Sequence, residues 1–202
     1  FCIWSDDGAA GLLRLTDGQR STFPLGDIAA LFIDRNGLPA IISGRNGGWL
    51  RLDAAGQKQA GPLDAQHIRV PAGSDRRAPT TGAMQTSRGK WRLVDLATLK
   101  PLGRNLFDDI LTDEGGRFRV LQGALWSAID ARSGKLLFAP RFRGLGPFGA
   151  GLAPASLDGR LWGYINVDAE WVLPPKYSSA GPFRARMARV NLAEGGTGFI
   201  DA

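Results

Sequence analysis

Short apolar runs and polar turns alternate along the whole chain, and one six-residue pattern recurs in it. The best copies, aligned on tryptophan, are GWLRLD (48–53), KWRLVD (90–95), LWSAID (125–130) and LWGYIN (161–166). A run of aliphatic, β-branched and aromatic residues that ends in Asp or Asn is typical of a strand entering a turn, because the Asx side chain bonds to nearby backbone. Weaker copies are GLLRLT (11–16) and GTGFID (196–201). The pattern predicts six strands, each followed by a turn.

The tryptophan of each copy, or the residue that replaces it, is its lead position. The six lead positions are Leu12, Trp49, Trp91, Trp126, Trp162 and Thr197. The four tryptophans are separated by 42, 35 and 36 residues. Self-similarity at a period of about 36 residues indicates a repeat protein, in which each unit contacts its neighbours. We expect residues 1–202 to form a single β-repeat domain of about six units.

A second column of the alignment indicates how these strands pack. The residue three positions after the lead is always aliphatic: Leu15, Leu52, Val94, Ile129, Ile165 or Ile200. Residues three apart lie on opposite faces of a straight strand, so both faces are partly apolar. This favours strands packed between neighbouring units over an exposed aromatic platform for a sugar. We therefore expect Trp49, Trp91, Trp126 and Trp162 to belong to the core of the repeat.

A third element follows each pair of strands. Turns such as LDGR (157–160) precede the leads and supply the positive φ angles of tight hairpins. After the hairpin, FAPRFRGLGPFGAGLA (138–153) matches LPPKYSSAGPFRARMA (173–188) without a gap. Proline cannot donate to a ladder, so it keeps this element short. We expect an all-β fold of three-stranded antiparallel β-meander units in an open curved array, with a closed six-bladed propeller-like ring as the alternative.

Residues 151–202 carry a family resemblance. They contain Trp162-Gly163, Tyr164-Ile165, Pro174-Pro175, Tyr177 and the closing Gly198-Phe199-Ile200-Asp201. In these motifs the chain resembles the WG-repeat (KWG-type) family of bacterial proteins. It departs from the family pattern where Leu50, Arg92 or Ser127 replaces the glycine. The resemblance implies a β-rich repeat protein without catalytic residues, often with an interaction role in bacterial surface, effector or toxin-immunity systems.

Composition agrees with a folded β protein. The chain has 44% hydrophobic and 22% charged residues, with 28 glycines and 12 prolines, which suits a chain that turns often. No apolar run approaches the ~18 residues of a membrane-spanning helix. The chain begins with Phe1 rather than Met, so we expect that an upstream segment has been removed. A cytoplasmic and a periplasmic or exported bacterial location both stay open.

Enzymatic hypotheses depend on few residues. His67 is the only histidine and Cys2 the only cysteine, and no nucleophile motif accompanies either. A zinc site needs three or four ligands, so we expect no metal site and no cofactor. Asp108, Asp109, Asp113 and Glu114 form the densest acidic cluster. Paired carboxylates could serve a glycosidase or hold Ca²⁺, but a solvated turn is favoured. A hydrolase that uses His67 and this cluster is therefore the least favoured hypothesis, and we expect no enzyme.

The arginines suggest a binding role. The net charge is +6 and the pI about 10.1, although acidic residues interleave with the basic ones. Arg141/Arg143 and Arg184/Arg186 are Arg-x-Arg pairs, which on a strand would present two guanidinium groups on one face to an anionic partner. We expect a non-catalytic module that binds another protein, for example to neutralise a toxin or effector. The alternative is a basic binder of an anionic envelope polymer or nucleic acid, with nucleic acid the less favoured partner.

Overall fold

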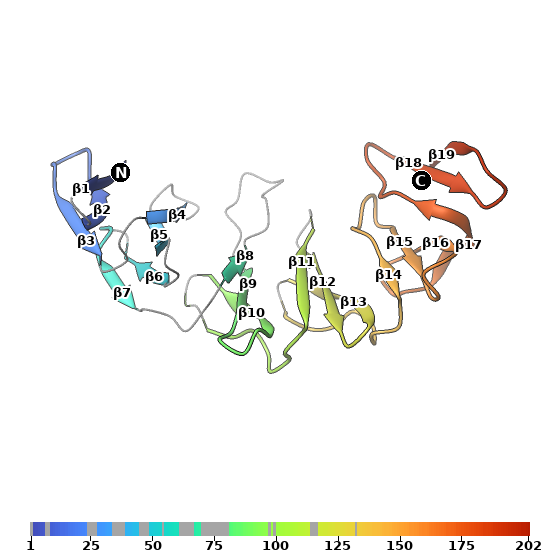
Figure 1. Ribbon diagram of the computed structural model, residues 1–202, viewed down its shortest axis with the longest axis horizontal. Coiled ribbons are helices and arrows are strands. Elements are labelled where there is room, and N and C mark those ends of the chain that lie inside the picture. The colour runs from blue at the N-terminus through green and yellow to red at the C-terminus, as the bar shows by residue number, and fades with distance from the viewer. Residues whose placement is uncertain are drawn as a thin grey trace.

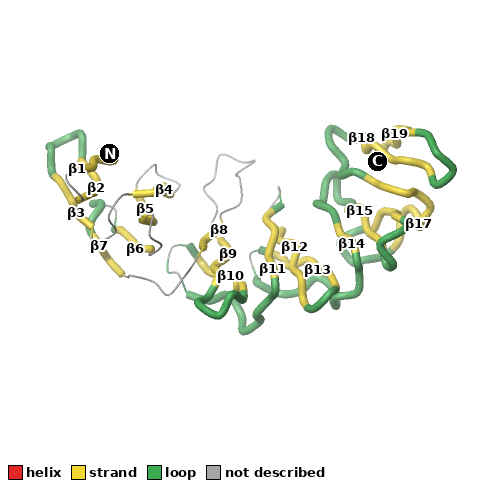
Figure 2. The backbone as a smooth tube through the Cα atoms, viewed as in Figure 1, coloured by secondary structure: helices red, strands yellow, loops and turns green. Residues whose placement is uncertain are grey.

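The computed structural model describes residues 2–6, 9–23, 28–33, 39–44, 49–53, 55–60, 67–69, 81–96, 98, 100–113, 117–131 and 133–202. Its regular elements are all strands (Figure 2). They are β1 (Cys2–Asp6), β2 (Ala9–Leu13), β3 (Arg20–Phe23), β4 (Ile28–Ile33), β5 (Pro39–Gly44), β6 (Trp49–Leu52), β7 (Lys58–Ala60), β8 (His67–Arg69), β9 (Thr81–Gln85), β10 (Trp91–Asp95), β11 (Asp109–Thr112), β12 (Arg117–Gln122), β13 (Leu125–Asp130), β14 (Gly144–Leu145), β15 (Ala153–Ser156), β16 (Trp162–Ile165), β17 (Trp171–Ala180), β18 (Met187–Leu192) and β19 (Thr197–Asp201). Within these ranges there is no helix of the length and apolarity needed to cross a membrane.

The strands form antiparallel sheets that follow one another along an open arc. Figure 1 shows the N- and C-terminal ends at opposite ends of this arc, so the ring is not closed. The described sheets are β1-β2-β3, β4-β5-β6-β7, β8-β9-β10, β11-β12-β13 and β14-β15-β16-β17-β18-β19. The predicted all-β fold of short antiparallel units is therefore confirmed. The sheets contain three, four, three, three and six strands, rather than three in every case.

Each lead position lies in the second strand of a hairpin. Among the described residues there are six such hairpins: β1–β2, β5–β6, β9–β10, β12–β13, β15–β16 and β18–β19. Trp49, Trp91, Trp162 and Thr197 begin their strands, whereas Leu12 and Trp126 lie within theirs. The sequence spacing thus corresponds to one hairpin per copy.

The segment that follows a hairpin pairs twice. Its first part pairs backwards with the lead residue: Trp91 with Phe107, Trp126 with Phe142 and Trp162 with Tyr177. Its second part pairs forwards with the next hairpin, as β11 does with β12 and β14 with β15. In β17 the two parts form one continuous strand that pairs with both β16 and β18. This sharing explains the six-stranded sheet, because two successive units there use a single uninterrupted strand.

The Asp or Asn that ends each of the four tryptophan copies makes the turn expected from the sequence. Asp53 Oδ1 accepts from the backbone N–H of Ala55, and Asn166 Oδ1 accepts from that of Asp168. Asp95 and Asp130 accept in the same way from residues three positions on. These bonds satisfy backbone donors where the strand stops, so they direct the chain into the third element.

The apolar cores lie between successive hairpins. One joins Trp91 and Leu93 of β10 to Phe118 and Val120 of β12, and Trp91 is only 4% exposed. The next joins Ala128 of β13 to residues of β14, β15 and β16, with half-buried Trp126 packed against it. A third joins Tyr164 of β16 to residues of β17 and β18, with half-buried Trp162 beside it. A two-stranded hairpin is marginal alone, so each one is stabilised by its neighbour. The side chain of Trp49 lies outside the described residues.

Candidate functional site

The groups considered for catalysis are held separately. His67 is exposed at the start of β8, and its backbone pairs with Gln85. Cys2 is a free, half-buried thiol in β1. The described residues contain no group of three or more His, Cys, Asp or Glu side chains that could hold a metal ion. Glu114 lies outside the described residues.

The described acids of the 108–114 cluster each have a cationic partner. Asp108 accepts a hydrogen bond from Lys90 Nζ and one of 2.7 Å from the Gly123 N–H, and the bond from Lys90 is the main reason why its pKa lies below the usual value. Asp109 Oδ1 lies 2.6 Å from Arg69 Nη1. Asp113 is buried, and Arg119 Nε donates to both of its oxygens at 2.8 and 3.1 Å. Among the described contacts none joins these carboxylates to His67, so the cluster has a structural role in the geometry seen here.

Several arginines connect successive sheets, a role that the sequence did not reveal. Each donates to a backbone carbonyl of the next sheet: Arg14 to Ala55, Arg69 to Ile110, Arg119 to Leu145 and Arg141 to Ala169. The guanidinium of Arg69 also lies 4.0 Å from the centre of the Trp91 ring. A planar, permanently charged group is suited to such combined stacking and hydrogen bonding. Part of the basic charge therefore stabilises the array.

The Asp113–Arg119 pair lies at one of these junctions. It lines a hollow of about 210 Å³ together with Thr112, Pro147, Phe148, Pro182, Phe183 and Arg184. Burial raises the pKa of Asp113 despite the neighbouring Arg119 charge. Because Asp113 and Arg119 already bond to each other, they leave few donors or acceptors for a ligand. We therefore assign this hollow a structural role between the sheets.

The two Arg-x-Arg pairs do not lie on regular strands, contrary to the geometry assumed from the sequence. The Arg141 guanidinium donates to the Ala169 carbonyl, and its Cζ lies 4.9 Å from the centre of the Phe142 ring. Arg143 is exposed. Arg184 begins a tight turn that is closed by its pairing with Met187, and Arg186 lies inside this turn. Ala185 and Arg186 have φ values of 46° and 70° in this turn. Arg184 and Arg186 therefore lie in a turn instead of sharing one strand face.

The surface best suited to a partner is the outer face of the β18–β19 hairpin. The register places Met187 opposite Asp201, Arg189 opposite Phe199 and Asn191 opposite Thr197. Phe199 is 67% exposed and Met187 45% exposed, whereas the alternate residues Ala188 and Val190 are buried. Sequence reasoning missed this face. The signal was present, because Phe199 directly precedes the aliphatic column residue Ile200 and must point to the other side.

Comparison with known families identifies repeats between residues 126 and 193. A family model described as a WG containing repeat matches residues 126–160 and 162–193. Residues 126–193 carry two tandem WG repeats. The two matches begin at Trp126 and Trp162, so the predicted resemblance is confirmed in both units. WG repeats suggest a module for protein interaction and are not known as enzymes.

Solved structures similar to this chain share little sequence with it. The computationally designed Ika4 protein is 7% identical with a TM-score of 0.42, and the match covers 61% of this chain and 86% of Ika4. BamB from Moraxella catarrhalis is 11% identical with a TM-score of 0.44, over 96% of this chain and 67% of BamB. Hsv2 from Kluyveromyces lactis is 15% identical with a TM-score of 0.47, over 87% of this chain and 60% of Hsv2. No curated protein matches the chain.

Proposed function

We propose that this WG-repeat chain is a non-catalytic module that binds another protein, and that the outer face of β18–β19 is part of the binding surface. The observation that carries the proposal is the exposure of Phe199 and Met187 on one face, with Arg189 of β18 directly opposite Phe199. Aromatic residues, Met and Arg are the residue types enriched in protein interfaces. Covering such apolar surface stabilises a complex by about 25 cal/mol per Å² before the costs of association.

The remaining chemistry supports a binding role over catalysis. The described acids at 108, 109 and 113 are each paired with Lys90, Arg69 or Arg119. A general base must lie within reach of the substrate proton that it accepts. A carboxylate already held in an ion pair by a lysine or an arginine is poorly placed for this role. A toxin or effector that the chain neutralises, as an immunity protein does, is one form of the proposed partner.

The test uses a partner captured from the native cell extract and then purified. Isothermal titration should show that Phe199→Ser weakens its binding by about tenfold or more, as expected for an aromatic anchor. Leu15→Ser is the matched control, because Leu15 is 68% exposed and closely follows β2, which lies at the other end of the arc. If the purified candidate does not bind the unmodified chain in the titration, or the extract yields no candidate, the proposed function is wrong. If a partner binds equally well to both variants, the assignment of this face is wrong.

A second candidate function is binding of an anionic envelope polymer or nucleic acid. It is favoured by Arg184, Arg186 and Arg189, which are all exposed around the start of β18. Binding to a polyanion releases counterions, so its affinity should fall steeply between low and moderate salt. An apolar protein interface should change little over the same range. The salt dependence of the captured complex therefore separates the two functions.

A further inference from the structure

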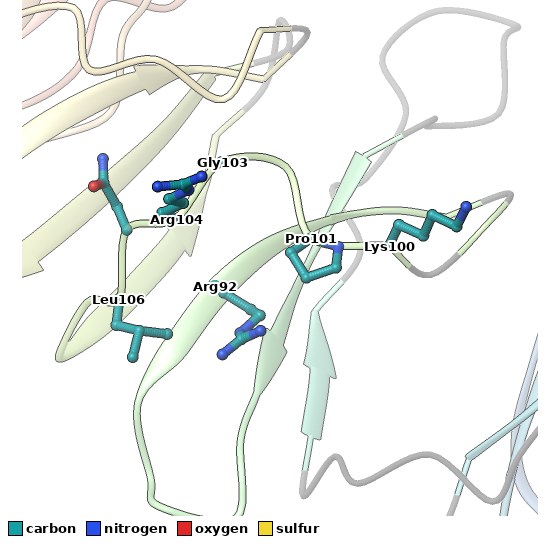
Figure 3. Close-up of a pocket in the computed structure, with 7 residues that line it drawn as sticks. Arg92, Lys100, Pro101, Gly103, Arg104 and Leu106 are labelled. Carbon is teal, nitrogen blue, oxygen red and sulfur yellow. The ribbon is translucent and has the colours of Figure 1, made fainter.

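A basic hollow of about 570 Å³ lies between β10 and the loop that follows it. It is lined by Arg92, Lys100, Pro101, Gly103, Arg104, Asn105 and Leu106. Figure 3 shows Arg92 projecting from the strand between Pro101 and Leu106, with Arg104 on the loop and Lys100 extending outward at the rim. The lining contains three cations and no carboxylate.

The hollow exists because Arg92 occupies the glycine position of the WG motif. In the repeat that begins at Trp162, a Cβ on Gly163 would lie 2.3 Å from the Leu173 carbonyl oxygen, so the following segment passes directly over the glycine. In the repeat that begins at Trp126, the hydroxyl of Ser127 donates to the equivalent carbonyl, that of Phe138. Leu173 and Phe138 each lie four residues before the aromatic residue that pairs with the lead tryptophan. In the repeat that begins at Trp91 this aromatic residue is Phe107, so the equivalent position is Gly103. The much larger side chain of Arg92 leaves no room for the following segment to cross directly over the strand. An open hollow lies between Arg92 and Gly103.

The positive charge of this hollow is not neutralised by the described protein. The Nε atom of Arg92 is buried and has no hydrogen-bond partner there. Among the described residues, no ion pair involves Arg92, Lys100 or Arg104. A guanidinium that is partly removed from water without an acceptor is unfavourable. An oxyanion in the hollow would relieve this cost.

We propose that the hollow binds a phosphate monoester of a small organic molecule. Two guanidinium groups, from Arg92 and Arg104, supply paired donors that suit the dianionic phosphate oxygens, and the Asn105 amide is a further donor. Lys100 adds positive potential at the rim. Pro101 and the 44% exposed Leu106 give an apolar wall for the organic group. The volume lies within the roughly 300–1,000 Å³ of small-molecule sites. The site is distinct from the protein-binding face on β18–β19.

The experiment titrates phenyl phosphate into the full chain by isothermal calorimetry. Arg92→Ser and Arg104→Ala should each weaken binding by about tenfold, the effect of losing one hydrogen bond to a charged group. Both variants introduce residues that the next repeat uses at the same positions, Ser127 and Ala139. Arg160→Ala is the matched control, because it removes one positive charge from an exposed turn and should leave the affinity unchanged.

Two further measurements keep the proposal falsifiable. The ¹⁵N–¹H signal of Arg92 Nε should move during the titration, and this readout needs no substitution. Benzoate, with one negative charge and the same ring, should bind more weakly than phenyl phosphate. The absence of saturable binding by phenyl phosphate would refute the site. Equal weakening by all three variants would also refute it, because it would show diffuse attraction to the net charge.

Discussion

Asp108 and Asp113 lie in one acidic cluster, yet their surroundings shift the two carboxyl pKa values in opposite directions. Asp108 is partly exposed, and the hydrogen bond from Lys90 is the largest cause of its lowered pKa. Asp113 is buried, and loss of hydration raises its pKa more than Arg119 lowers it. Residue type and spacing do not distinguish the two, because burial is decided by which sheet covers them.

This difference predicts opposite pH dependences of stability. The native state binds a proton on Asp113 more tightly than the unfolded chain does. The contribution of Asp113 to the free energy of unfolding should therefore be largest at low pH and decline as pH rises through the raised pKa of this residue. Asp108 should contribute above its ordinary pKa and lose that contribution as pH falls through its lowered pKa. Urea unfolding from about pH 3 to about pH 7 should show this in the differences between wild type and Asp113→Asn, and between wild type and Asp108→Asn. Parallel slopes of the two differences would contradict the assignment.

Within the repeat, the conformation of the third element depends on the size of one side chain in the lead strand. Gly163 allows Leu173, Pro174 and Pro175 to pass over it, and a β-bulge in the β16–β17 pairing accommodates this crossing. Ser127 reaches the crossing segment with its hydroxyl, and Arg92 faces an open hollow. The same strand pairing therefore tolerates side chains of three very different sizes at this position.

A methyl group at the glycine position should accordingly be costly in the last repeat. Gly163→Ala places a Cβ 2.3 Å from the Leu173 oxygen and should destabilise the fold by about 1–3 kcal/mol, as overpacking does. Gly198→Ala is the control, because its Cβ would meet only Val190 Cγ2 at 4.0 Å and should change stability by less than about 0.5 kcal/mol. Urea unfolding measures both. Equal stability of the two variants would show that the crossing segment moves aside freely.

The whole molecule is an open series of hairpins whose cores lie at the junctions. The two junctions on either side of β11–β13 combine an apolar cluster with polar links, namely Arg119 to the Leu145 carbonyl and Thr81 to the Ala131 carbonyl. The β12–β13 hairpin thus packs against both of its neighbours, and the hairpins follow one another along the arc (Figure 1). Extended surfaces of this kind are typical of repeat proteins that bind other molecules.

The open arrangement predicts an elongated particle in solution. Small-angle X-ray scattering should give a radius of gyration well above about 17 Å, the value for a compact domain of 202 residues. The reason is that chain contacts are made along the array and not around a single centre. A value near that of a compact domain would indicate a closed ring, the alternative that the arc in Figure 1 contradicts.

Local sequence was enough to predict the repeat, its strands and its turns. The lead tryptophans, the aliphatic column and the closing Asp or Asn recur because each hairpin has the same covalent and packing requirements, and these act within a few residues. The family resemblance and the all-β fold were predicted correctly for this reason. The exposed position of Phe199 could also have been inferred, because alternation along a strand is local.

The positions of the charged groups required the folded chain. Arg141 reaches the carbonyl of Ala169, and Arg119 reaches that of Leu145, across junctions that no pattern of spacing specifies. Arg184 begins a turn and Arg186 lies within it, because Arg184 pairs with Met187 and the chain reverses between them. Arg92 lines a hollow together with Lys100 and Arg104 of the loop that follows its strand. Long side chains bind whatever the neighbouring unit presents, so their roles follow from packing between units and not from sequence alone.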